Sequence, residues 1–197
     1  MKLQTDGIGL TALILVMLPW IGVALTLLFR KKPAEAAETK RAPAATWAIA
    51  LQSVSFALVW SLPRANWWPF APSLAGEIIL AVAAIGLTWG SAWLCVSAVR
   101  TLGKQWTYRA RVIEGHQLVT QGPYSLVRNP IYLGMFGAIV GAGLAFSRWW
   151  TLFPAVVIFL IANRIRINAE ERLLREIFGA AFDEYAQKVP AFFPGLF

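Results

Sequence analysis

Charged residues are scarce in this sequence, and their scarcity excludes an ordinary soluble domain. Only 14% of the 197 residues are charged, whereas 58% are hydrophobic. A soluble domain carries about 25% charged residues, and a water-soluble core of this size could not bury so much apolar surface. We therefore interpret the chain as an integral membrane protein, and its length favours a single domain over residues 1–197.

Cysteine and histidine are almost missing. The sequence holds one cysteine, Cys95, and one histidine, His116, with no HExxH motif and no pair of cysteines. These absences exclude an internal disulfide and predict that the protein has no metal site. No glycine-rich loop follows a strand and opens a helix, so a Rossmann nucleotide site has no support. Cys95 lies within an apolar segment and is predicted to be a small buried residue.

Acidic residues are outnumbered by basic residues, 10 to 18, and the net charge is +8. In a soluble protein this charge would suggest a nucleic-acid partner. Here the basic residues flank apolar segments, where Lys and Arg set membrane topology and contact anionic headgroups. We therefore expect a membrane environment and no nucleic-acid partner.

Five apolar runs predict an all-α bundle of about five transmembrane helices. The first three runs cover residues 8–29, 46–62 and 74–99. The first has 22 residues without a charge and ends at Arg30-Lys31-Lys32, so it suits a spanning helix better than a signal peptide. The polar, Ala/Pro-rich residues 31–45 that follow are expected to form an exposed linker.

The last two apolar runs, residues 131–146 and 149–162, are 16 and 14 residues long. Runs this short predict a tight helical hairpin packed on the first three helices. Gly137 and Gly141 offer a small-residue face for close helix contact. Residues 163–178 are expected to form a separate amphipathic helix that ends at Gly179.

The distribution of Lys and Arg predicts the orientation in the membrane. With five passes, Lys2, Arg64 and Arg148 fall on one side and the other 15 of the 18 basic residues fall on the opposite side. We expect the protein in the inner, cytoplasmic membrane. The positive-inside rule then places the amino terminus outside, and the carboxy terminus and the active site in the cytoplasm.

A polar island over residues 115–134 separates the third and fourth runs. It contains His116, Arg128, two tyrosines and two prolines. With five passes it lies on the same side as the Glu170-Glu171 pair, so the two segments can share a site. Aromatic rings and carboxylates favour a cationic ligand such as a sulfonium, and arginine favours a carboxylate or phosphate.

The island and the glutamate pair resemble isoprenylcysteine carboxyl methyltransferases and related phospholipid methyltransferases. That family has the pattern Arg-His-Pro-x-Tyr-x-Gly, a hydrophobic stretch and Glu-Glu; this chain has Arg128-Asn129-Pro130-Ile131-Tyr132-Leu133-Gly134 and Glu170-Glu171. The resemblance covers roughly the last half of the chain, from Leu102 onward. It implies a methyltransferase catalytic region over residues 101–197, preceded by three transmembrane helices in residues 1–100.

The resemblance implies S-adenosylmethionine as methyl donor and a membrane lipid or lipidated acceptor, in first place an isoprenylcysteine carboxylate that becomes O-methylated. Three residues are expected to act in catalysis, with Arg166 facing the acceptor: Arg166, Glu170 and Glu171. By position, the residues expected to bind the cofactor are His116, Gln117, Leu118, Val119, Tyr124, Arg128, Asn129, Pro130, Ile131, Tyr132 and Glu170.

Asn129 stands where the family usually has histidine, and asparagine cannot carry a proton. Methyl transfer to a carboxylate or thiolate needs no general base, whereas transfer to an amine or hydroxyl does. The lack of a spare histidine therefore favours an anionic acceptor oriented by Arg166. N- or S-methylation of a phospholipid or another lipid is an alternative.

Structural interpretations of the same residues stay open. Arg166 with Glu170, and Glu171 with Arg175, are spaced i and i+4, as in ordinary surface ion pairs on a helix. Arg128 could instead satisfy carbonyl groups near a helix end.

Two other functions also fit the hydrophobic pattern. A sterol-reductase-like enzyme would use a nicotinamide cofactor. A non-enzymatic membrane protein would not need the side chains of Tyr124, Tyr132 and Glu170 to converge. The sequence leaves the oligomeric state open.

Overall fold

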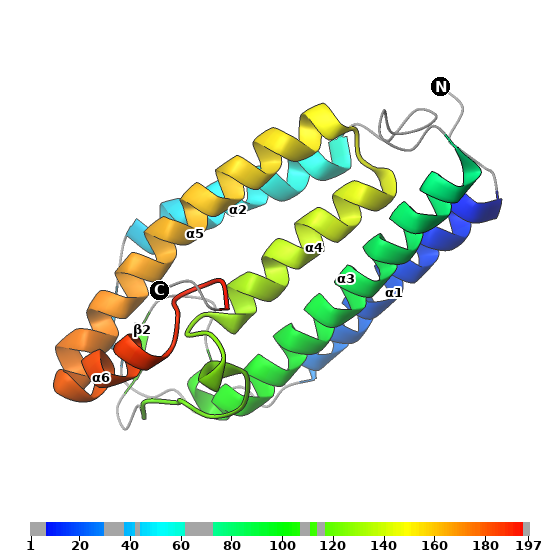
Figure 1. Ribbon diagram of the computed structural model, residues 1–197. Coiled ribbons are helices and arrows are strands. Elements are labelled where there is room, and N and C mark those ends of the chain that lie inside the picture. Colours follow the sequence, from blue (N-terminus) through cyan, green and yellow to red (C-terminus); the bar gives the residue numbers. More distant parts are fainter. Residues whose placement is uncertain are drawn as a thin grey trace.

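The computed structural model describes residues 7–29, 38–41, 44–61, 73–106, 111–113 and 117–194 (Figure 1). Within these ranges the regular elements are helices, apart from one short pair of strands. The helices are α1 (Gly7–Leu28), α2 (Ala44–Ser61), α3 (Leu74–Leu102), α4 (Pro130–Phe146), α5 (Trp149–Phe178) and α6 (Ala180–Lys188), with single 3₁₀ turns η1 (Gly103–Gln105) and η2 (Gly122–Ser125).

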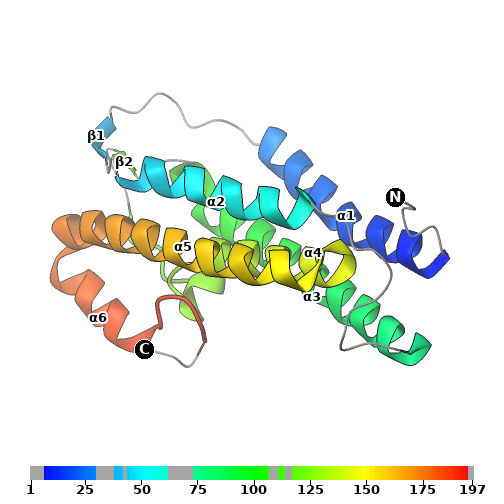
Figure 2. The same cartoon turned by 90° about the horizontal axis from the view of Figure 1, so that it is seen from above.

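The five long helices form one bundle. Helix α4 lies between the pair α1 and α3 and the pair α2 and α5, and it contacts all four of them (Figures 1 and 2). Helices α1, α3 and α5 are long and apolar enough to cross a membrane, while 47–61 and 130–145 form shorter apolar helices. The predicted polytopic helical membrane bundle is therefore confirmed, and the chain is an integral membrane protein.

Small residues bring α3 and α4 into close contact. A Cβ atom added to Gly137 would collide with Ser91, and one added to Gly141 would collide with Thr88. Backbones can approach this closely only where side chains are absent, which is how membrane helices gain packing contacts. The small-residue face predicted from Gly137 and Gly141 is confirmed.

The predicted boundary between the last apolar run and the amphipathic helix is wrong. Helix α5 continues without a break from Trp149 to Phe178 and ends at Gly179, whose φ of 50° favours glycine. No glycine or proline interrupts the chain where the polar residues begin, and Asn163 and Arg166 are buried. One 30-residue helix thus carries both the membrane segment and the glutamate pair.

The two strands and helix α6 were not predicted. Strand β1 (Glu38–Arg41) pairs antiparallel with β2 (Arg111–Ile113), so part of the expected exposed linker pairs with the approach to the polar island. Helix α6 folds back beside α5, and its Phe182 and Tyr185 pack with Val189 and Leu118. These contacts hold the carboxy-terminal segment against residues 117–129 at one end of the bundle.

Candidate functional site

The carboxy-terminal third of α5, which carries Glu170 and Glu171, lies at the end of the bundle where α3 ends and α4 begins (Figure 1). Neighbouring residues on a helix point about 100° apart, so the two carboxylates meet different partners. Glu170 contacts side chains of α4 and α5, and Glu171 contacts the residues that precede α4.

Glu170 lies at the centre of one polar cluster. It accepts a hydrogen bond from the hydroxyl of Tyr132 and another from Nη2 of Arg166, the latter at 3.3 Å. The guanidinium carbon of Arg166 is 5.0 Å from the centre of the Tyr132 ring, within the range of a cation–π contact. A carboxylate, a guanidinium and an aromatic ring therefore meet at one point.

The cluster extends along α5 towards the middle of the bundle. Nη1 of Arg166 donates to Oε1 of Gln52 at 3.2 Å, and Nε2 of Gln52 donates to Oδ1 of Asn163 at 2.6 Å. Neither Gln52 nor Asn163 was among the residues predicted for the site. The available signal was a polar amide inside an otherwise apolar run, and nothing in the sequence linked it to Arg166.

Glu171 belongs to a second cluster, which we name the clasp: Arg128, Asn129, Glu171 and the segment 186–191. Arg128 donates to both oxygens of Glu171, at 2.8 and 3.2 Å. Its Nη1 also donates to the carbonyl of Ala186 at 2.8 Å and to that of Val189. Nδ2 of Asn129 donates to the carbonyl of Ala191 at 2.8 Å. The clasp thus joins the start of α4, α5 and the carboxy-terminal segment.

The i,i+4 pair that the sequence left open between Glu171 and Arg175 does not form. Arg175 instead binds Asp183 of α6 at 2.7 Å, and both side chains are about half exposed, at 49% and 50%. Arg128 and Glu171 are only 12% and 14% exposed. Because burial removes competing water, the Arg128–Glu171 pair is the stronger interaction of the two.

Two tyrosines connect the clasp to the Glu170 cluster. The hydroxyl of Tyr185 donates to the carbonyl of Tyr124 at 2.6 Å. Burial raises the pKa of Tyr185 to about 12. Burial and the nearby charge of Glu170 raise the pKa of Tyr124 above its usual value. Both phenols are therefore neutral at physiological pH, and Tyr124 lies within electrostatic reach of Glu170.

The remaining predicted residues line the same end of the bundle or lie outside the described residues. The backbone N–H of Gln117 donates to Oε1 of Gln105 at 2.6 Å, and Leu118 packs against the α6 core. Val119 is half-buried, Pro130 is buried at the first position of α4, and the carbonyl of Ile131 accepts from the thiol of Cys95 at 3.6 Å. His116 lies outside the described residues.

Cys95 itself is buried between α3 and α4, as the sequence predicts.

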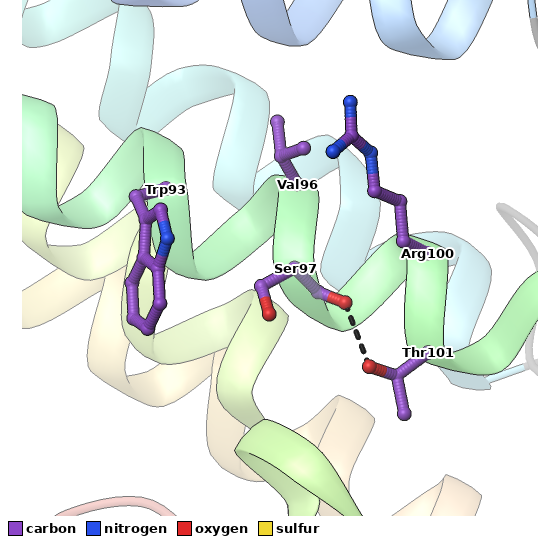
Figure 3. A pocket seen from close by; sticks show the side chains of 5 residues that line it. All are labelled: Trp93, Val96, Ser97, Arg100 and Thr101. Atoms are coloured by element: carbon purple, nitrogen blue, oxygen red, sulfur yellow. Dashed lines mark hydrogen bonds between the residues drawn. The ribbon is translucent and has the colours of Figure 1, made fainter.

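An open hollow of about 360 Å³ lies along the carboxy-terminal turns of α3. It is lined by five residues of that helix alone: Trp93, Val96, Ser97, Arg100 and Thr101 (Figure 3). None of them belongs to the predicted site or to either polar cluster. The buried ion pairs and hydrogen bonds between polar side chains gather around Glu170 and Glu171 instead, so that region is the candidate site.

Comparisons with known proteins identify relatives of the chain. It is 35% identical over 121 residues to a nickel-cobalt-cadmium resistance protein of Alcaligenes xylosoxydans xylosoxydans, covering 55% of each chain. It is 33% identical over 100 residues to protein-S-isoprenylcysteine O-methyltransferase B of Arabidopsis thaliana, covering 50% of this chain and 51% of the relative. The corresponding enzyme of Schizosaccharomyces pombe is 30% identical over 129 residues, covering 62% and 54%.

The chain spans about half the length of these curated relatives. The family model for phospholipid methyltransferases matches residues 79–181, which is more than half of the 197 residues. This range contains Tyr132, Arg166 and both glutamates of the two clusters. The chain therefore belongs to the phospholipid methyltransferase family.

Proposed function

We propose that this protein transfers the methyl group of S-adenosylmethionine to a membrane-embedded or lipidated acceptor, with an isoprenylcysteine carboxylate as the first candidate. The observation that carries the proposal is the meeting of Tyr132, Arg166 and Glu170 at one end of the bundle. Family membership and the isoprenylcysteine methyltransferases among the relatives support the same chemistry.

The residues of the Glu170 cluster fit the proposed cofactor. S-adenosylmethionine supplies an electrophilic methyl group on a positively charged sulfur. Glu170 accepts from the hydroxyl of Tyr132, and a carboxylate and an aromatic ring placed together attract such a cation. Gln117, Leu118, Val119 and Tyr124 lie in the adjoining segment, and with His116 they are the residues we assign to the rest of the cofactor.

The clasp residues are assigned a supporting role in this proposal. Arg128 and Asn129 donate to Glu171 and to backbone carbonyls, so their donors are already engaged. They hold the carboxy-terminal segment over the start of α4, which is formed by Pro130, Ile131 and Tyr132. Such a cover helps exclude water and fixes the geometry that an in-line displacement requires.

Arg166 is the residue we assign to the acceptor. Its guanidinium is buried beside Glu170 and Tyr132, and a guanidinium binds carboxylates with matched geometry. An ionised carboxylate acceptor needs no general base. We further infer from the charge distribution that the site faces the cytoplasm, with the cofactor entering from water and the acceptor from the bilayer.

An amine acceptor is the second candidate, because the matching family is described as phospholipid methyltransferases. A protonated amine must lose a proton before it can attack. Glu170 and Glu171, which belong to the two clusters, are the carboxylates we assign to accept it. Separation of methylated lipids from methylated prenylcysteine distinguishes this candidate from the first.

Calorimetry on the purified protein tests the proposal directly. We expect S-adenosylmethionine to bind the unmodified chain and to bind Glu170→Gln at least tenfold more weakly. Glu184→Gln removes a carboxylate from an exposed position on α6 and should bind like the unmodified chain. Equal binding by all three would remove Glu170 from the cofactor site. NADPH binding without S-adenosylmethionine binding would instead support a reductase.

A methyl-transfer assay identifies the acceptor. Membranes that contain the protein are incubated with radiolabelled methyl donor and N-acetyl-S-farnesylcysteine, and lipids are separated from the prenylcysteine ester. Base-labile label on the prenylcysteine supports O-methylation of a carboxylate. Label confined to phospholipid headgroups supports the amine candidate, and absence of label in both fractions argues against a methyltransferase.

A further inference from the structure

Gln52 and Asn163 are amide side chains buried at the interface of α2 and α5. They are only 4% and 2% exposed, and each lies about midway along its helix. Helix α2 also lies outside residues 79–181, the range matched by the family model. A polar side chain is costly at this depth unless it is hydrogen-bonded, so the arrangement requires a physical explanation.

The hydrogen bonds around Gln52 fix the direction of its amide group. Its nitrogen donates to Oδ1 of Asn163 at 2.6 Å, which turns its oxygen towards Nη1 of Arg166 at 3.2 Å. Asn163 and Arg166 are three residues apart on α5, so one amide from α2 bridges both of them. Gln52 is thereby held as an acceptor for the guanidinium.

Arg166 is constrained from two directions as a result. Gln52 accepts from Nη1, and Glu170 accepts from Nη2 at 3.3 Å. A flexible arginine side chain loses rotamer entropy when it binds a ligand, and both contacts select one orientation before a substrate arrives. Preorganisation of this kind improves binding of the group that the guanidinium receives.

We propose that Gln52 is a positioning residue for Arg166, and that Asn163 sets the orientation of Gln52. The two amides tune the affinity of the site for the oxygen-bearing group of the membrane acceptor, a carboxylate or a phosphate. They do not contact the methyl donor. This inference rests on the proposed function, in which Arg166 receives the acceptor.

The test uses apolar substitutions of similar volume, because they retain the packing of α2 against α5. Gln52→Met should raise KM for the acceptor about tenfold while kcat and the Kd for S-adenosylmethionine change less than twofold. Asn163→Leu should raise KM by a similar factor, since Gln52 is then free to turn away. The acceptor measured is N-acetyl-S-farnesylcysteine or the phospholipid that the unmodified protein labels.

The double variant Gln52→Met/Asn163→Leu separates positioning from stability. Replacing both partners of a buried hydrogen bond by apolar groups is often nearly neutral for stability. We therefore expect the double variant to unfold at a higher temperature than Gln52→Met, because no unpaired Asn163 amide remains, yet to keep the tenfold higher KM, because Nη1 of Arg166 still lacks its acceptor. A merely structural role would instead restore KM together with stability.

Ser55→Ala provides the matched control. Ser55 is also buried on α2, and its hydroxyl donates to the carbonyl of Ala155 on α5 at 2.6 Å. Its removal takes one hydrogen bond from the same interface without touching Arg166, so stability should fall while KM stays unchanged. A raised KM in Ser55→Ala, or an unchanged KM in both single amide variants, would overturn the inference.

The role of Gln52 and the proposed methyl transfer can be tested separately. If the unmodified protein binds S-adenosylmethionine and transfers methyl groups while Gln52→Met behaves like it, only the role of Gln52 is wrong. If the unmodified protein neither binds the methyl donor nor labels any acceptor, the proposed function fails, and the inference fails with it.

Discussion

Two adjacent carboxylates on α5 have opposite surroundings. Glu170 is bound by the side chains of Tyr132 and Arg166, and it is linked through Arg166 to Gln52. Glu171 is bound by Arg128, whose remaining donors bind backbone carbonyls of the carboxy-terminal segment. One cluster consists of side chains alone, whereas the other ties three parts of the backbone together.

This difference indicates that Glu170 serves ligand binding and that Glu171 serves stability. Side chains around Glu170 can exchange a protein partner for a ligand without disturbing the backbone. The carbonyls around Arg128 have no such freedom, because a buried carbonyl that loses its donor carries a desolvation cost of about 1–3 kcal/mol. We therefore expect substitutions near Glu171 to affect stability first and substitutions near Glu170 to affect ligand binding first.

The largest effect is expected for Arg128→Leu. The substitution leaves Glu171 as an unpaired charge and removes the donors to Ala186 and Val189. Breaking a largely buried ion pair costs about 3 kcal/mol, which corresponds to a fall in Tm of roughly 6–12 °C for a chain of this size. Tryptophan fluorescence during heating in detergent measures the change.

Arg175→Leu serves as the comparison for that experiment. It removes an arginine from a pair with Asp183 that is about half exposed, and such pairs contribute little to stability because water screens them. An equal loss of stability in the two variants would show that burial does not distinguish the clasp from an ordinary surface pair.

The next effect concerns the two glutamates directly. We expect Glu170→Gln to lower methyl transfer about 100-fold, the cost of losing alignment at a reacting centre, with a change in stability below about 1 kcal/mol. Glutamine keeps an oxygen that accepts from Tyr132 and Arg166. Glu171→Gln should show the reverse: a loss of roughly 1–2 kcal/mol of stability and a rate within about threefold of the unmodified chain.

The methyl-transfer rate and the unfolding temperature of Glu170→Gln and Glu171→Gln, measured in parallel, test these two expectations. If Glu171→Gln slows methyl transfer as much as Glu170→Gln while remaining stable, the clasp takes part in the reaction. The division between the two clusters would then be wrong.

A smaller effect is expected at Asn129, the position where the family usually has histidine. Asn129 precedes α4, and its amide nitrogen donates to the carbonyl of Ala191 at 2.8 Å instead of capping the helix. Asn129→Ala should therefore cost about 1 kcal/mol of stability and leave the rate nearly unchanged. A large loss of rate at full stability would instead assign Asn129 to the reaction.

The membrane bundle could be predicted from the sequence because the bilayer simplifies the problem. Apolar runs must form helices that satisfy their own backbone groups, so the predicted runs 8–29 and 46–62 match α1 and α2 within two residues at each end. The continuity of α5 could not be predicted in the same way. Polarity changes at Asn163, but nothing in the backbone chemistry stops the helix there.

The positions of the two glutamates at one end of the bundle could be anticipated from the resemblance and from topology. Their separate partners could not, since i,i+4 spacing suggested Arg175 for Glu171 while the folded chain provides Arg128. The link from Gln52 to Arg166 depends on how α2 packs against α5. Contacts between residues more than 100 positions apart leave no periodic signal in one sequence.

The smallest effect is expected for Tyr185→Phe, which removes a single bond between α6 and the turn η2. The hydroxyl of Tyr185 donates to the carbonyl of Tyr124 at 2.6 Å, and its loss should cost about 1 kcal/mol. Burial raises the pKa of Tyr185 to about 12, so the unfolded chain releases this proton more readily than the folded one. The stabilisation from Tyr185 is therefore complete below about pH 10, the usual tyrosine pKa, and declines as the pH rises towards 12.

Unfolding temperatures of Tyr185→Phe and the unmodified chain, measured from pH 8 to pH 11.5, test this point. The difference between them should be constant up to about pH 9.5 and shrink above it, because the hydroxyl then favours the unfolded chain. A difference that stays constant to pH 11.5 would mean that Tyr185 titrates alike in both states. A difference of zero at every pH would mean that its hydroxyl does not fasten the carboxy-terminal segment, and the clasp would then rely on Arg128 and Asn129 alone.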